Sequence, residues 1–405
     1  MSWRKERGHE KKEAIDNVFL GMLVFFGIGL FFQQPLAFMV VGILGAHYIL
    51  NRIYDNNLEN SLDLLNPKHT VRLFPEEQTV LKLEVENRSF FPLANGELKF
   101  QLADTVQVEP PFEATNDEVT SYSLPLSFIG KRKTTIELPL KAEKRGTARM
   151  YNIKYQFPHL FNFDWVILRH DFSSRTELVV FPTPLPVKGM DSFIQMNAGP
   201  QRSNLSPFED VQSPLGTREY NYSDPFYRIN WKATAKTQRL QTNVYEKAVD
   251  ISYLLIVNLS SESSANRWGV NPKLETILSH TAFLSQSLTE KGYPFEIFIN
   301  LRKHGKNPYV QVPEGEGKMH YVNALETLAR INPLSSTMPF DQMLAYIGKQ
   351  SAKPSTVIII GEVPQDAVRI MDSWKNRQNK VFQVVENEGG AVIGAVGKGG
   401  VTHAI

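Results

Sequence analysis

Two apolar stretches dominate the pattern of residues near the start of the chain. Residues 15–32 and 36–50 are almost wholly apolar, and His47 is the only strongly polar residue inside the second stretch. Each stretch is slightly shorter than the ~20 residues that cross a bilayer, but flanking residues can extend both. Lipid cannot hydrogen-bond an open backbone, so spanning segments are helical. We therefore predict a two-helix transmembrane hairpin over residues 15–54. A buried hairpin in a soluble core is the alternative.

Basic residues flank the predicted hairpin unevenly. The turn between the two stretches has none, whereas the residues before the first stretch include Arg4, Lys5, Arg7, Lys11 and Lys12. Arg52 follows the second stretch. Lys and Arg in short flanking segments stay on the cytoplasmic side of a membrane. We expect a multi-pass protein of the cell membrane, with residues 1–14 and all residues after the hairpin in the cytoplasm.

Short runs of alternating apolar and polar residues fill the segment 62–183. Examples are TVLKLEVEN, GELKFQL and TTIELPL, and turn residues separate the runs. Alternation with a period of two is typical of half-buried strands. About eight such strands predict an all-β, immunoglobulin-like sandwich. Prolines alternate at positions 182, 184 and 186, and because proline fixes φ we assign residues 184–214 to a semi-rigid linker.

The last third of the chain has a different pattern. Residues 251–257 form an uncharged run rich in β-branched side chains, which is typical of a strand buried on both faces. Amphipathic segments that predict helices then alternate with further short apolar runs. This alternation predicts a mostly parallel sheet covered by helices on both faces. We assign the α/β domain to residues 251–390 and a flexible tail to residues 391–405.

Composition narrows the range of functions. A chain of 405 residues is too long for one ordinary core, which favours two soluble domains beside the hairpin. A net charge of +2 gives no electrostatic case for binding nucleic acid. The absence of cysteine excludes thiol catalysis, disulfides and thiolate metal sites. No Gly-x-Ser-x-Gly elbow is present and no histidine sits in a catalytic motif, so we do not expect an enzyme. The oligomeric state is left open.

Residues 215–250 contain the densest group of charged and aromatic residues in the chain. The candidate residues are Gly216, Arg218, Tyr220, Asp224, Arg228, Trp231 and Lys232. Arg218, Asp224 and Arg228 are close enough in sequence to share one ion-paired network. Arg228, Trp231 and Lys232 have the spacing of one helical face. The network either pins this segment onto the following domain or presents arginine and aromatic side chains to a partner, since those residues are common in binding hot spots.

The order of these residues resembles the family called domain of unknown function 58 (DUF58). The resemblance rests on Gly-x-Arg-x-Tyr, then Asp, then Arg-Ile-x-Trp-Lys-x-x-Ala, followed by a buried strand. It implies that the α/β domain is similar to von Willebrand factor type A domains, behind a membrane hairpin and a β-rich domain. It also implies a membrane-tethered protein that works with a MoxR-type AAA ATPase and that has no catalytic activity of its own.

The same resemblance implies a place for a magnesium ion. In type A domains an Asp-x-Ser-x-Ser motif at the end of the first strand, with a later Thr and Asp, holds Mg²⁺ through oxygen atoms. The matching residues are Asn258, Ser260, Glu262, Thr337 and Glu362. Because Asn258 is neutral and Glu262 is longer than serine, we expect a degenerate site and no cofactor.

Two alternative functions remain open at this point. One is a working magnesium site, which would make ligand binding by the type A domain Mg²⁺-dependent. The other is a hydrolase of envelope substrates, which requires the soluble part of the chain to lie outside the cell.

Overall fold

The computed structural model describes most of the chain. The described residues are 3–6, 11–58, 61–65, 68–109, 113–116, 120–162, 164–171, 174–197, 201–202, 209–249, 252–261, 269–303, 305, 307–350, 355–375, 379–387, 389–396 and 402–404. The chain divides into two compact units, Met1–Phe181 and Pro182–Ile405. Each unit is described by itself below.

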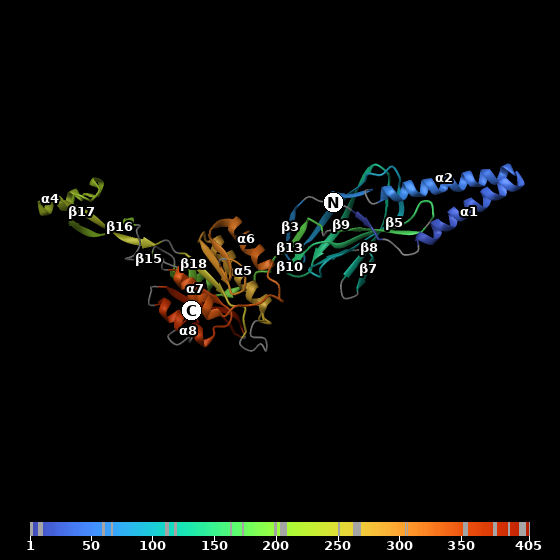
Figure 1. The fold of residues 1–405 in the computed structure, drawn as a ribbon. Helices are drawn as coiled ribbons and strands as arrows, with labels where there is room; N and C mark the ends of the chain where they lie inside the picture. The colour runs from blue at the N-terminus through green and yellow to red at the C-terminus, as the bar shows by residue number, and fades with distance from the viewer. Residues whose placement is uncertain are drawn as a thin grey trace. The chain divides into compact units, whose positions relative to one another are not determined.

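The first unit begins with two neighbouring helices, α1 (Lys11–Phe32) and α2 (Pro35–Leu58), which pack along each other (Figure 1). Within the described residues, α2 is the one helix that is long and apolar enough to cross a membrane, and the apolar part of α1 is the shorter segment Phe19–Phe32. Large apolar side chains on both helices are exposed, including Phe31 at 84% and Leu36 at 71%. An apolar helix near the start of the chain is therefore present, as the sequence predicted.

Both ends of this helical pair are attached to the same β-rich region. Before α1, strand β1 (Trp3–Lys5) pairs antiparallel with β12 (Trp165–His170), and Trp3 is buried. At the end of α2, Tyr54 is buried and its ring lies 4.6 Å from the ring of His159. Lys5 forms an ion pair with Asp55. The chain thus leaves the β-rich region through α1 and returns to it through α2.

Three sheets make up the β-rich region. The first has the order β1, β12, β11 (Tyr151–Pro158), β5 (Leu93–Gln101), β8 (Thr120–Phe128) and β7 (Glu113–Asn116). The second has the order β2 (Leu62–Leu65), β4 (Gln78–Asn87), β9 (Arg132–Ala142) and β6 (Val106–Val108). The third consists of β10 (Gly146–Ala148), β13 (Glu177–Val180) and β3 (Thr70–Leu73). Alternate side chains of the first two sheets share one buried core, which accounts for the period of two in the sequence. The immunoglobulin-like topology stays a prediction.

The second unit is built on an eight-stranded sheet (Figure 1). Its order is β14 (Val187–Lys188), β23 (Gly390–Val396), β22 (Lys380–Asn387), β21 (Thr356–Ile360), β18 (Tyr253–Val257), β19 (Phe295–Ile299) and β20 (Val310–Gly315), with β24 (Thr402–Ala404) beside β23. The four central strands are parallel. β18 and β21 are buried at every position, as uncharged β-branched runs predict.

Five helices connect or cover these strands. They are α3 (Met190–Asn197), α5 (Leu274–Glu290), α6 (Gly317–Ala329), α7 (Phe340–Gln350) and α8 (Gln365–Lys375). α5 contacts α6, whereas α7 contacts α8, and apolar residues of α7 and α8 share a core with one face of the sheet. The C-terminal part of the chain is therefore an α/β region. Its similarity to a type A domain stays a prediction.

Two expected irregular segments contain regular structure. Residues 184–214 were expected to be a linker, yet they include β14 and α3, where Phe193 is fully buried. Residues 391–405 were expected to be a flexible tail, yet Ala391 to Val396 belong to β23 and pair with β22. Both corrections have the same cause, because these segments bury apolar side chains against strands that lie far away in the sequence.

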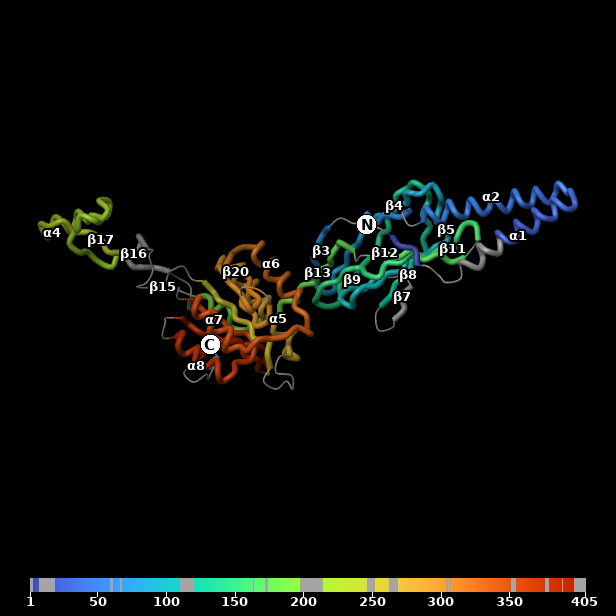
Figure 2. The backbone as a smooth tube through the Cα atoms, in the orientation of Figure 1, coloured from blue at the N-terminus to red at the C-terminus, as the bar shows by residue number. Residues whose placement is uncertain are grey.

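Residues 209–249 of the second unit form a separate β-hairpin that we call the arm. β16 (Glu209–Glu219) pairs antiparallel with β17 (Gln241–Val249), and β15 (Gln201–Arg202) pairs with the end of β17. Between the two long strands lie a 3₁₀ helix, η1 (Phe226–Arg228), and the short helix α4 (Trp231–Thr237). Figure 2 shows the backbone running out along β16 and back along β17, with α4 at the end of the hairpin.

Candidate functional site

An ion pair holds the turn at the end of the arm. Both terminal nitrogens of Arg218 donate to the carboxylate of Asp224, each at 2.7 Å. The main-chain N–H of Asn221 donates to the same carboxylate at 2.9 Å, and the Tyr220 hydroxyl donates to the Asp224 carbonyl at 3.1 Å. The hydrogen bonds from Arg218 and then from Asn221 lower the pKa of Asp224 below its usual value. Three of the candidate residues thus fix the backbone of the turn.

The helix that follows is fixed by Asn230. Its side-chain oxygen accepts from the main-chain N–H of Ala233 at 2.9 Å, which caps the start of α4. Its amide nitrogen donates to Asn243 of β17 at 2.8 Å. Arg228 lies in η1, before this cap, whereas Trp231 and Lys232 lie in α4. The expected single helical face for these three residues is therefore wrong, because Ile229 is extended and Asn230 begins a new helix.

Large aromatic side chains of the arm point outward. The exposed fractions are 99% for Tyr222, 69% for Phe226, 79% for Tyr227 and 61% for Trp231. The rings of Phe226 and Trp231 lie edge to face, 6.2 Å apart. We call these four residues the aromatic tip. The Arg218–Asp224 pair orders the backbone of the arm's own turn beneath them, and contact of these residues with a partner stays a prediction.

A second group of candidate residues lies at the carboxyl end of β18. The Asn258 side chain is buried, and its nitrogen donates to the Glu362 carbonyl at 2.6 Å. Its oxygen accepts from the Ser260 hydroxyl at 2.6 Å, the Ser260 N–H at 3.0 Å and the Asn300 side-chain nitrogen at 2.7 Å. The structure thus joins Asn258 and Ser260, and it adds Asn300, which was not among the candidates.

Asn300 is fully buried and connects the segments after β18 and β19 with the segment before α7. Its oxygen accepts from the Leu259 N–H at 2.7 Å, and its nitrogen donates to the Met338 carbonyl at 3.2 Å as well as to Asn258. The sequence contained a signal for it, because Asn300 directly follows β19 as Asn258 directly follows β18, and these strands are parallel neighbours. We call Asn258, Ser260 and Asn300 the amide network.

The other candidate magnesium ligands do not join this network through their side chains. Thr337 is buried, and its hydroxyl lies 3.5 Å from the Gly269 carbonyl. Glu362 contributes its carbonyl to the network, while its carboxylate accepts from the Asn271 side chain at 3.3 Å. Glu262 lies outside the described residues.

The described residues, so arranged, do not fit Mg²⁺. The Asn258 oxygen that an ion would need already accepts three hydrogen bonds, and within the described ranges no three His, Cys, Asp or Glu side chains gather at one point. The side-chain nitrogen of Asn300 places positive partial charge 2.7 Å from the Asn258 oxygen.

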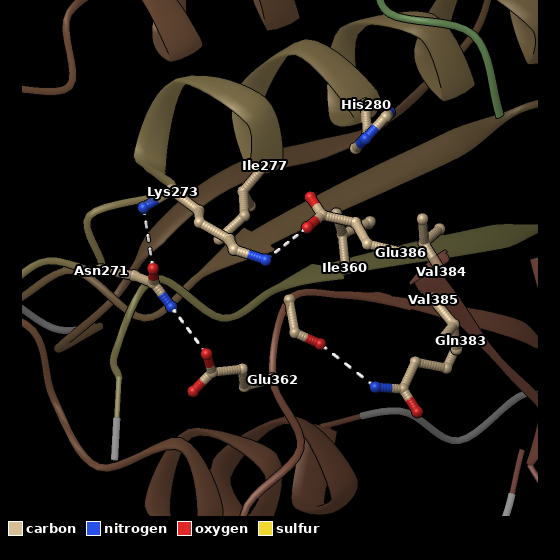
Figure 3. A pocket seen from close by; sticks show the side chains of 11 residues that line it. Asn271, Lys273, Ile277, His280, Ile360, Glu362, Gln383, Val384, Val385 and Glu386 are labelled. Carbon is tan, nitrogen blue, oxygen red and sulfur yellow. Dashed lines mark hydrogen bonds and ion pairs between the residues drawn. The ribbon is translucent and has the colours of Figure 1, made fainter. Parts of the chain in front are cut away.

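A pocket of about 230 Å³ is lined in part by Glu362, whose carbonyl accepts from Asn258 of the amide network. Figure 3 shows the side chains that line this pocket. One wall comes from α5 and the residues before it, and the other from the carboxyl ends of β21 and β22. Lys273 forms an ion pair with Glu386 across it, with 2.5 Å between nitrogen and oxygen. The hydrogen bond with Glu386 is the largest cause that raises the pKa of Lys273, and the charge of Glu362 contributes further.

The comparisons with known proteins agree with one part of the sequence analysis. Residues 216–392 match the family model described as "Protein of unknown function DUF58", which supports the DUF58 resemblance for that part of the chain. No curated protein matches the chain.

Solved structures give only weak likenesses. A mutant of Salmonella alpha-2-macroglobulin shares 15% identity over 29% of this chain and 7% of its own, with a TM-score of 0.19. A type I cohesin–dockerin complex from Clostridium thermocellum shares 10% identity over 29% of this chain and 94% of its own, with a TM-score of 0.20. A non-cellulosomal cohesin from Archaeoglobus fulgidus shares 7% identity over 34% of this chain and 99% of its own, with a TM-score of 0.20. At these scores the likenesses carry no argument about fold or function.

Proposed function

We propose that this protein is a membrane-anchored interaction protein and that its arm docks a MoxR-type AAA ATPase in the cytoplasm. The observation that carries the proposal is the aromatic tip, with four large exposed aromatic side chains on a turn that is fixed by hydrogen bonds and an ion pair. The choice of partner comes from the DUF58 resemblance of residues 216–392.

The membrane anchor is supported by the arrangement of the first unit. α2 has the length and apolar composition of a spanning helix, and the exposed apolar side chains of α1 and α2 require a non-aqueous environment. β1 and the end of α2 contact the same β-rich region. A pair of spanning helices satisfies this arrangement, because the chain then returns to the side from which it left. Basic residues before α1 favour the cytoplasm as that side.

The docking role is supported by the chemistry of the tip. Tyrosine and tryptophan lose few rotatable bonds on binding and combine a large apolar area with a polar atom. Arg228 lies 5.8 Å from the ring of Tyr227 and 5.8 Å from that of Tyr245, so its planar group is also positioned by contacts. Aromatic and arginine side chains held in this way are the usual centre of a binding hot spot.

The charge around the tip indicates what the partner presents. Residues 214–245 contain five Lys or Arg and two Asp or Glu. Both carboxylates are in ion pairs, Asp224 with Arg218 and Glu219 with Arg239 at 2.9 Å. Lys232 and Lys236 add further positive charge on α4. The complementary surface on the ATPase therefore combines carboxylates with apolar pockets.

The test is a binding measurement with two tryptophans of equal exposure. Trp231 on the tip is 61% exposed and Trp165 on β12 is 62% exposed. With the full chain in lipid nanodiscs and the purified ATPase, Trp231→Ala should weaken binding by about 30-fold, the effect of losing a hot spot of ~2 kcal/mol. Trp165→Ala should leave binding unchanged. Equal effects of the two substitutions, or no binding by the wild type, would refute the proposal.

A reporter fused after residue 405 tests the cytoplasmic orientation.

A further inference from the structure

The pocket beside the amide network lies where an open parallel sheet usually binds a ligand. β18 is followed in sequence by its neighbour β19 on one side, and the chain later returns to β21 on the other side. Ligand sites of such sheets lie at the carboxyl ends of strands near this change of direction. The pocket is lined there by Ile360, Gly361 and Glu362 at the end of β21 and by residues of β22 and α5 (Figure 3).

Apolar side chains form part of the pocket wall. Ile277 of α5, Ile360 of β21 and Val384 of β22 all line it, and the first is 5% exposed. A volume of about 230 Å³ is below the ~300 Å³ at which pockets for drug-sized ligands begin. The space therefore suits a group about as large as one long side chain.

The polar part of the lining holds donors and acceptors, and its two amide donors are already used, since Gln383 donates to the Gly361 carbonyl and Asn271 to the Glu362 carboxylate. Glu362 and Glu386 contribute carboxylates. His280 is 3% exposed, and its Nδ1 lies 3.0 Å from the Leu185 carbonyl. A carbonyl only accepts, so Nδ1 carries the hydrogen. Among the described residues no partner is recorded for Nε2. A ligand for this pocket must bring donors.

One ammonium group already demonstrates which donor the pocket takes. The Lys273 nitrogen lies 2.5 Å from the Glu386 carboxylate, although 62% of the lysine side chain is exposed. Glu362 lines the pocket as well, and its negative charge acts on the same ammonium, while its carboxylate accepts from the Asn271 side chain at 3.3 Å. This excess of negative charge leaves room for a second cation, or for one that replaces Lys273.

We propose that this pocket binds an ammonium group carried on a short alkyl chain, with the chain against Ile277, Ile360 and Val384 and the ammonium at Glu362 and Glu386. Lysine has this chemistry, since its stem covers apolar surface while its charged end reaches a polar group. A free alkylamine has it as well. The site is separate from the arm and goes beyond the proposed function.

Saturation-transfer NMR on the full chain in nanodiscs tests the chemistry directly. Butylammonium is the probe, butan-1-ol keeps the chain without the charge, and methylammonium keeps the charge without the chain. Butylammonium should bind with the lowest Kd of the three. Butan-1-ol binding as tightly would overturn the role of charge, and methylammonium binding as tightly would overturn the role of the apolar wall.

Substitutions separate this proposal from a purely structural role for the ion pair. Lys273→Met removes the competing ammonium and should lower the Kd for butylammonium by about two- to fivefold. This factor corresponds to the interaction free energy of a partly exposed ion pair. Glu386→Gln and Glu362→Gln should raise it. The control is Lys291→Met, because Lys291 forms an exposed ion pair with Asp191 at the other end of α5. A weaker affinity in Lys273→Met would overturn the proposal.

The same measurement identifies the source of the ammonium. N-acetyl-lysine amide binding as well as butylammonium indicates a lysine side chain of a protein, and a preference for butylammonium indicates a free amine. Both results support the site, whereas binding of neither probe refutes it. Trp231→Ala should leave both Kd values unchanged, so failure of the docking proposal is distinguishable from failure of this one.

Discussion

Replacing Asn300 by leucine tests whether the amide network holds the sheet end together. Leucine has a similar size, but it can neither accept from the Leu259 N–H nor donate to Asn258. Asn300 is fully buried, so water cannot take over these bonds in the folded protein. This substitution removes the centre of the amide network.

The expected cost follows from the number of groups left without partners. The Leu259 N–H, 2.7 Å from the Asn300 oxygen, loses its partner, which costs about 1–3 kcal/mol for a buried donor. The Asn258 oxygen keeps its two bonds from Ser260, so loss of the third contributes only about 0.5–1.5 kcal/mol. The sum is about 1.5–4.5 kcal/mol. Because 1.4 kcal/mol is a factor of ten, amide exchange in β18 should accelerate about 10- to 1,600-fold.

Hydrogen exchange followed by mass spectrometry is the suitable assay, since a chain with two compact units does not unfold in one step. It reports the opening free energy of β18 separately from that of the β-rich region. Asn379→Leu is the matched control, because Asn379 is half-buried and accepts a hydrogen bond from Ser355 N–H at 2.8 Å. This control should change exchange in β18 by less than tenfold.

Magnesium provides the second arm of the experiment. With the Asn258 oxygen occupied by three donors, millimolar Mg²⁺ or EDTA should leave exchange in β18 of the wild-type protein unchanged. Protection that rises with Mg²⁺ in the wild type, or an Asn300→Leu variant that exchanges like the wild type, would show that the reasoning about the amide network is wrong.

Three further predictions concern other parts of the chain. Tyr155→Phe removes a buried hydroxyl that lies 2.9 Å and 2.8 Å from two carbonyls, and hydrogen exchange in β11 should show a loss of about 1–3 kcal/mol. Arg218 lowers the pKa of Asp224, so the fluorescence of the arm should be constant above the ordinary carboxyl range and change as pH falls through the lowered pKa, but not in Asp224→Asn. Burial raises the pKa of Glu296, so Glu296→Gln should slow exchange in β19 at neutral pH, and this gain should vanish below the pKa of an unfolded glutamate, about 4.3.

The elements that the sequence predicted well are those with local patterns. β18 and β21 are uncharged runs, and α5 has apolar residues at helical spacing, so their side chains alone decide where they lie. β1 and β14 are too short for any period to appear, and each is a strand only because it pairs with β12 or β23, far away in the chain. Long-range pairing of this kind is not contained in a local pattern.

The residues of the candidate sites also fall into those that a local pattern indicates and those that only the order of the sheet brings together. Asn258 could be named from the end of a single strand, whereas Asn300 requires knowing that β18 and β19 are adjacent and parallel. The pocket was not found from the sequence, because Lys273 and Glu386 are 113 positions apart. Charged residues on two separate elements become a site only when the sheet order brings those elements together.

The exposure of the aromatic tip has a local cause that a sequence can reveal in retrospect. In an ordinary surface helix the large apolar residues face the protein and the small polar ones face water. α4 reverses this order, because Ala233 and Thr234 are half-buried while Trp231 is 61% exposed. The Thr234 hydroxyl accepts from the Gln241 N–H of β17 at 3.0 Å, which fixes the small residues against the hairpin and turns the tryptophan outward. Trp231 meets Phe226 edge to face, yet most of its surface stays exposed, which supports the docking role proposed above for the aromatic tip.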